Sequence, residues 1–132
     1  MRYMLMMHAP RGSGQYQTSS WSSDDLTAHI AFMHDLNRDL TAAGELVTAQ
    51  GLAAPGDARI VKVGKDGVPA VTDGPYPETK EFLAGFWIVD VDSTDRAYEI
   101  AARVSGAPGP GGKPIVIPVE VRQVMIAPST EA

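Results

Sequence analysis

"VTDGPYPETKEFLAGFWIVDV", residues 71–91, leads from an Asp-Gly-Pro turn through a charged cluster into an apolar stretch. In its last part, "GFWIVDV" at 85–91, apolar side chains occur at both odd and even positions. "RYMLMM" at 2–7 has the same property. An antiparallel strand with one face in water alternates apolar and polar residues. The two stretches therefore predict strands that are covered on both faces.

Two helices are predicted between the strands. Ser22 and Asp25 form a capping box, and Gly44 is a typical helix stop, so the first helix is expected to end at about Ala43. "DSTDRAYEIAARVSG" at 92–106 predicts the second helix. Further strands are predicted from apolar runs separated by turns, at 45–52, 58–64, 69–73 and 115–126.

This order of elements predicts a single α+β domain over residues 1–132, with an antiparallel sheet and both helices on one face. Residues 127–132 are expected to form a flexible tail. Two helices cover only one face of a sheet, and each large apolar side chain left in water forgoes about 1.5 to 3 kcal/mol. We therefore expect the second face to pack against another copy in a homodimer. The alternative is a monomer whose additional strands fold over that face.

Composition narrows the classes of function. The chain has 132 residues and a net charge of −5, which disfavours binding to nucleic acid. It contains no cysteine, so it has neither disulfides nor thiolate metal ligands. No segment approaches the roughly 18 apolar residues of a membrane span, and the run in "MRYMLMMHAP" is too short for a signal peptide. We expect a cytoplasmic protein with no membrane partner.

The first predicted helix carries two histidines. Helical periodicity places one arc of the helix against the sheet, and its apolar members are Leu26, Ile30, Met33, Leu36, Leu40 and Ala43. His29 lies inside this arc with Asn37 as a possible local partner, whereas His34 lies at its flank. A buried histidine needs a hydrogen-bond partner. It is either a structural residue bonded to a backbone carbonyl or a proton-transfer group at the edge of a cleft.

Other chemistry has weaker sequence support. His29 and His34 are five residues apart and point about 140° away from each other, so they do not form a helical zinc pair. "SGAPGPGGKP" at 105–114 lacks the first glycine and the Ser or Thr of a phosphate-binding loop. A Gly-x-Ser-x-Gly nucleophile motif is also absent. We expect neither a metal nor a cofactor.

"TDGPYPETKEFLAGFWIVDV" closely resembles the Asp-Gly-Pro-Phe-Ala-Glu-Thr-Lys-Glu signature of the DGPF-type, YCII-related family, with Tyr76 in place of Phe and Pro77 in place of Ala. Similarity extends to "MRYMLMMHA", to "AHIAFMHDLNRDLTAAGELVTAQGL" and to "AARVSGAPGPGGKPIVIPVEVRQV". The resemblance implies a ferredoxin-like fold that dimerises through its sheets, as in the dimeric α/β-barrel group. It also implies an active site formed by a His–Asp pair in a cleft.

The motif acid of the family matches Asp73, and the helical histidine matches His29, with His34 as the alternate. Gly74 and Pro75 fix the chain after Asp73, which equally suits a structural Asx-type turn. In one hypothesis the protein is a cofactor-independent lyase or isomerase, in which His29 is the general acid and base and Asp73 fixes its tautomer. The residues expected to bind the small-molecule substrate are His8, Tyr76 and Trp87. In the alternative, the protein is a non-catalytic dimeric module that binds a metabolite or a regulatory partner.

Overall fold

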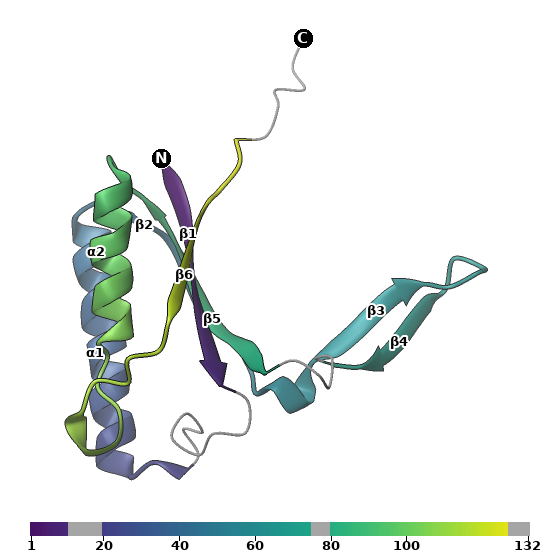
Figure 1. The fold of residues 1–132 in the computed structure, drawn as a ribbon, viewed down its shortest axis with the longest axis horizontal. Coiled ribbons are helices and arrows are strands. Elements are labelled where there is room, and N and C mark those ends of the chain that lie inside the picture. Colours follow the sequence, from purple (N-terminus) through teal and green to yellow (C-terminus); the bar gives the residue numbers. More distant parts are fainter. Residues whose placement is uncertain (11–19, 75–79, 127–132) are drawn as a thin grey trace.

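The computed structural model describes residues 1–10, 20–74 and 80–126. Their elements, in chain order, are β1 (Arg2–Pro10), α1 (Ser23–Ala42), β2 (Leu46–Gly51), η3 (Pro55–Asp57), β3 (Arg59–Val63), β4 (Pro69–Asp73), β5 (Glu81–Asp90), α2 (Thr94–Ser105), η4 (Pro110–Gly112) and β6 (Val119–Gln123). Figure 1 shows one four-stranded sheet, two helices beside it, and a hairpin that extends away from both.

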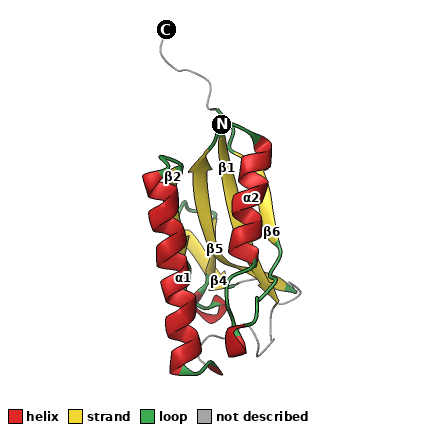
Figure 2. Cartoon of the chain, turned by 90° about the vertical axis from the view of Figure 1, so that its left-hand side faces the viewer, coloured by secondary structure: helices red, strands yellow, loops and turns green. Residues whose placement is uncertain are grey.

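The main sheet has the strand order β2-β5-β1-β6, and all of its neighbouring strands are antiparallel. Both helices cover the same face of this sheet (Figure 2). The predicted α+β fold, of the ferredoxin-like kind with two helices on one face, is confirmed. No helix in the described part of the chain is both long and apolar enough to cross a membrane.

The helix boundaries follow the capping residues. The Ser22 hydroxyl accepts a hydrogen bond from the backbone N–H of Asp25, so Ser22 is the N-cap, whereas the Asp25 carboxylate accepts from the backbone N–H of Gly111. Gly44 follows the end of α1 with a φ of +73°, a conformation that favours glycine. Ser93 caps α2 in the same way, because its hydroxyl accepts from the backbone N–H of Arg96.

The core lies between the sheet and the helices. In β1 the buried residues alternate with half-buried ones, so that Leu5 and Met7 point toward the helices. Trp87 and Val89 of β5 join them from the neighbouring strand. From the helix layer the core receives the fully buried side chains Leu36, Leu40, Ile100 and Val104. The fully buried part of α1 is therefore short, since among its residues only Leu36 and Leu40 are buried.

The arc predicted for α1 is partly wrong. Leu36 and Leu40 are buried as expected, but Ile30 is 45% exposed and Ala43 is exposed. Phe32, which was not on the predicted arc, packs against the core instead. The buried side of α1 is thus rotated about the helix axis relative to the arc that its apolar residues define.

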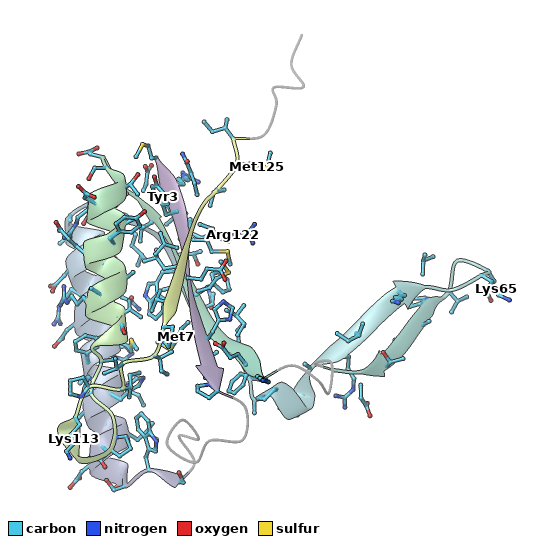
Figure 3. All side chains as sticks on the ribbon, viewed as in Figure 1. Tyr3, Met7, Lys65, Lys113, Arg122 and Met125 are labelled. Atoms are coloured by element: carbon cyan, nitrogen blue, oxygen red, sulfur yellow. The ribbon has the colours of Figure 1, made fainter. Side chains whose placement is uncertain are left out.

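The face of the sheet opposite the helices carries the alternate side chains of the two central strands, β1 and β5. Register pairs Met4 with Ile88 and Met6 with Phe86, and all four side chains are half-buried on the face that neither helix covers. Figure 3 shows Arg122 on this side of the sheet and Tyr3 toward the helices. We call this the open face. Its apolar centre agrees with the two-faced strands predicted from the sequence, whereas the predicted homodimer stays a prediction.

The predicted strand at 115–126 is shorter in the structure. Within this stretch, only the residues of β6, Val119–Gln123, pair with β1. Ile115 and Ile117 before it are buried, and between them Val116 has a φ of +52° and is 69% exposed. A β-branched residue rarely adopts a positive φ, so the chain turns here instead of continuing the ladder.

One ion pair ties the start of β2 to the start of α2. Arg96 donates to both carboxylate oxygens of Glu45, at 2.9 Å each, and also contacts Glu99 at 3.1 Å. The hydrogen bonds from Arg96 hold the pKa of Glu45 below its usual value. Because the folded-state pKa is lowered, this contribution to stability is present above the unfolded-state pKa and is lost as the pH falls through the folded-state pKa.

Glu45→Gln should lower the unfolding free energy at pH 7 by roughly 1 kcal/mol, since it weakens a bidentate, partly exposed ion pair. The difference from wild type should shrink once the pH falls below about 4.5, the ordinary pKa of the group. Urea denaturation from pH 7 to pH 3 measures it. Glu99→Gln is the matched control, because Glu99 is 66% exposed and should change stability less. If the unfolding free energies of wild type and Glu45→Gln differ equally at pH 7 and pH 3, the ion pair does not have the role described.

Candidate functional site

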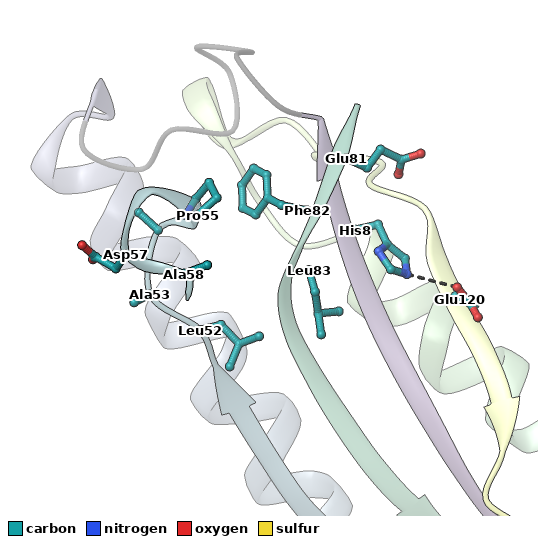
Figure 4. A pocket seen from close by; sticks show the side chains of 11 residues that line it. His8, Leu52, Ala53, Pro55, Asp57, Ala58, Glu81, Phe82, Leu83 and Glu120 are labelled. Carbon is teal, nitrogen blue, oxygen red and sulfur yellow. Dashed lines mark hydrogen bonds and ion pairs between the residues drawn. The ribbon is translucent and has the colours of Figure 1, made fainter. Parts of the chain in front are cut away.

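A pocket of about 730 Å³ opens at one end of the sheet. One wall is the segment 52–58, which connects β2 to the hairpin and contains η3. The first residues of β5, among them Phe82 and Leu83, form the floor, and His8 and Glu120 form the far side (Figure 4). Most of this lining is apolar. A concave, largely apolar site with a few convergent polar groups is the usual form of a small-molecule site.

A β-bulge in β5 shapes the floor of the pocket. Met7 pairs with Gly85 but His8 pairs with Leu83, so Ala84 is an extra residue in β5. A bulge of this kind shifts the alternation of side chains by one position. Leu83 therefore shares the open face with His8, while Phe82, one residue earlier, packs against the core.

The polar group of the pocket is a histidine–carboxylate pair. His8 Nε2 lies 3.1 Å from Glu120 Oε1, and the other carboxylate oxygen of Glu120 lies 3.6 Å from Arg122 Nε. Strand β6 alternates, so that Val119 and Val121 point inward while Glu120 and Arg122 point to the open face. The side chain of His8 is 29% exposed and that of Glu120 is 45% exposed. The pair is thus accessible from the pocket.

The carboxylate fixes the form of the imidazole. An ionised carboxylate only accepts hydrogen bonds, so a neutral His8 must donate from Nε2 to Glu120 and carry its lone pair on Nδ1. Nδ1 has no hydrogen-bond partner in the part of the chain that the structure describes. Figure 4 shows this nitrogen on the side of the ring that faces Phe82 and Leu83. The arrangement leaves a basic nitrogen directed toward the pocket.

The predicted catalytic histidine lies elsewhere. His29 Nδ1 is 2.9 Å from the backbone carbonyl oxygen of Pro108, in the loop that follows α2. Its ring also meets the ring of Trp21 edge-on, at a centroid distance of 5.2 Å. These are the contacts expected of a structural histidine, one of the two interpretations that the sequence left open. They join α1 to the loop that contains η4.

The predicted catalytic acid has a different neighbour. Asp73 ends β4, its side chain is 98% exposed, and its carboxylate lies 3.7 Å from Arg59 Nε. No contact between Asp73 and His29 occurs among the described residues. The pairing of these two residues stays a prediction, and within one chain the structure gives each a separate partner.

The remaining predicted residues are distributed over the molecule. His34 is exposed on α1. Trp87 is buried in the core, where its indole N–H donates to Asn37 Oδ1 at 2.9 Å, so it lies on the helix side of the sheet. Tyr76 lies outside the described residues. Of the residues expected to bind substrate, His8 is the one that lines the described pocket.

Glu120 and the wall at 52–58 were not predicted from the sequence as parts of the site. The alternation "VEVR" at 119–122 indicates that Glu120 and Arg122 share one face of a strand. That signal does not show that β6 pairs with β1, which is what brings Glu120 to His8.

Within residues 1–10, 20–74 and 80–126, no cluster of three or more His, Asp or Glu side chains is arranged to hold a metal ion.

Comparison with known proteins identifies the family. The model of the YCII-related domain matches residues 1–108. The chain belongs to the YCII-related family. An uncharacterized protein of Rhizobium meliloti (strain 1021) is 33% identical to this YCII-related chain over 90 residues, which is 68% of the chain and 72% of that protein. His8 and the pocket wall lie inside the range that the family model matches, whereas Glu120 lies beyond it.

His29→Ala should destabilise the fold by about 1 to 3 kcal/mol, because it leaves the Pro108 carbonyl without its donor and removes the contact with Trp21. Thermal denaturation measures the loss as a lower Tm. His34→Ala, at an exposed position of the same helix, is the control and should melt near wild type. Equal melting of the two variants would mean that His29 is not structural, and would return it to the list of proton-transfer candidates.

Proposed function

We propose that this protein is a small-molecule enzyme that uses His8 as its general acid and base, with Glu120 as the group that orients the imidazole. The observation that carries the proposal is the His8–Glu120 pair, 3.1 Å apart, at the side of a pocket of about 730 Å³. The proposed reaction belongs to the class expected from the sequence, but its histidine and its carboxylate are different residues.

The lining suggests the kind of substrate. Leu52, Pro55, Phe82 and Leu83 provide apolar contacts. Among the described lining residues, the carboxylate side chains are those of Asp57, Glu81 and Glu120, and there is no Lys or Arg. Because like charges repel, this wall disfavours an anionic substrate. A neutral or cationic molecule with an apolar body and a carbonyl group fits best.

The reaction begins at a carbon next to that carbonyl. Nδ1 of His8 removes the proton, the electrons of the C–H bond form an enolate, and the imidazolium is stabilised by the Glu120 carboxylate. If the substrate carries a β,γ double bond, the enolate is a dienolate, and returning the proton to its γ-carbon moves the double bond into conjugation, which is isomerisation. Loss of a leaving group with its electron pair from the neighbouring carbon gives elimination. A positioned acid–base group contributes about 10² to 10⁴ in rate.

The proposal includes a homodimer that forms through the open face. Met4, Met6, Phe86 and Ile88 make an apolar centre. The strands on either side of it contribute polar residues that face the same way, namely Thr48, Gln50, Glu120 and Arg122. An apolar centre with a polar rim is the pattern of protein interfaces.

Proton abstraction can be measured without knowing the natural substrate. Cyclohexanone and cyclohex-2-enone, incubated with the protein in D₂O, should exchange their α-protons faster than in buffer alone, as followed by ¹H NMR. His8→Gln should return the rate to that of buffer, a loss of about 10²-fold or more. Glu120→Gln should lower the rate less, because the imidazole remains.

His34→Gln is the matched control and should exchange like wild type, since His34 is exposed and outside the pocket. If His8→Gln exchanges as fast as wild type, the assignment of His8 is wrong. If wild type binds these ketones in saturation-transfer NMR but does not accelerate exchange, the non-catalytic binding module is the better account.

Sedimentation equilibrium tests the dimer. Wild type at micromolar concentration should have twice the chain mass of 14.0 kDa. Phe86→Lys should give the mass of one chain, because it places a charge in the apolar centre of the open face. Thr48→Lys, at the rim, should leave the dimer largely intact. A wild-type mass of one chain at these concentrations would rule the dimer out.

A further inference from the structure

The hairpin formed by β3 and β4 has almost no support from the rest of the described chain. Every residue of β4 is exposed, and in β3 only Ile60 is half-buried. The two strands pair only with each other, as a separate sheet. A two-stranded hairpin by itself is marginally stable in water. An exposed hairpin of this length is therefore expected to have a partner.

The two faces of the hairpin differ. Register pairs Val61 with Val71 and Val63 with Pro69, so these four side chains share one face. Val61, Val63 and Val71 are 59%, 81% and 58% exposed. The other face carries Lys62 paired with Ala70, together with the half-buried Ile60. We call the first of these the valine face.

The position of the hairpin relates it to the pocket. It leaves the molecule on the side of the open face, and its turn, where Lys65 lies, is far from the sheet (Figures 1 and 3). The segment 52–58, which leads into β3, is one wall of the pocket. The pocket therefore lies at the corner between the open face and the base of the hairpin, and it is open between them.

We propose that the hairpin is an arm whose valine face packs against a second copy of this chain docked on the open face, and that the second copy forms the missing wall of the pocket. This inference rests on the dimer of the proposed function. It adds the element that holds the second copy and makes the site incomplete in a single chain.

The area available favours an arm. Four strands spaced by about 4.8 Å, over about six residues, give the open face a flat area of about 400 Å². A stable interface needs about 800 Å² of accessible surface from each partner. The hairpin, with two five-residue strands about 17 Å long, adds about 160 Å² on its valine face. The arm thus enlarges by more than a third the surface that one chain offers, toward the area of a stable dimer.

Closure by a second copy would also serve the chemistry. Excluding water from the pocket strengthens the interaction between His8 and the Glu120 carboxylate and protects an enolate from unwanted protonation. A molecule that binds only in the closed pocket would favour the dimer by mass action.

The double variant V61T/V71T tests the arm. Threonine keeps the shape and strand preference of valine but places two hydroxyl groups on the valine face. Sedimentation should show a dimer dissociation constant raised by about 10-fold. The matched control is K62T/A70T, which changes a cross-strand pair on the other face and should leave the dissociation constant unchanged.

Chemical modification tests the closure. Diethyl pyrocarbonate labels accessible histidines, and peptide mass spectrometry reports each of them separately. His8 should react several-fold more slowly at high micromolar than at low micromolar protein, whereas the exposed His34 should react equally at both. V61T/V71T should lose the protection of His8 at the same concentration, and K62T/A70T should keep it.

The inference is overturned if V61T/V71T and K62T/A70T dimerise equally. It is also overturned if His8 reacts equally in monomer and dimer. Hydrogen–deuterium exchange of the amides in β3 and β4 of wild type gives a measurement that needs no variant. They should be better protected at high protein concentration, and equal protection at all concentrations counts against the arm. None of these readouts depends on turnover, so the catalytic role of His8 can fail while the arm stands, and the reverse.

Discussion

The constraint on which the rest of the structure depends is that the central strands are apolar on both sides while helices cover only one. Leu5 and Trp87 face the helices, and Met6 and Phe86, their neighbours along the same strands, face away. The first set forms the core that fixes α1 and α2. The second set leaves a surface that costs free energy in water. The pocket, its polar pair and the hairpin all lie on this second side.

A single extra residue in β5 determines which side chains line the pocket on the open face. Without the bulge at Ala84, regular alternation would turn Leu83 toward the core and Phe82 toward the open face. With it, Phe82 completes the core while Leu83 and His8 lie together under the pocket. The pairing of β2 with β5 ends beside the bulge, at Gly51 and Gly85, whereas β1 and β5 continue to pair as far as Pro10 and Glu81.

Local features of the sequence predicted the fold well. Ser22, Gly44 and Ser93 mark helix ends in the structure, because caps depend on backbone groups within a few residues. The rotation of α1 was not predictable from its periodicity, since Ile30 and Phe32 are both apolar and only the sheet distinguishes them. The pairing of β6 with β1 joins residues more than 100 positions apart, and no pattern within either strand specifies it.

The same limit applies to the candidate site. His8 was expected to bind substrate, and it lines the pocket, but its partner Glu120 depends on that long-range pairing. A histidine on the buried arc of a helix needs a partner, and for His29 the structure supplies it in Pro108, from a loop whose path the sequence does not show.

The hairpin of β3 and β4 is held together by its own ladder, as a sheet separate from the four-stranded one. Because its ladder shares no strand with the four-stranded sheet, we expect it to be a separate cooperative unit that opens and recloses while that sheet stays intact.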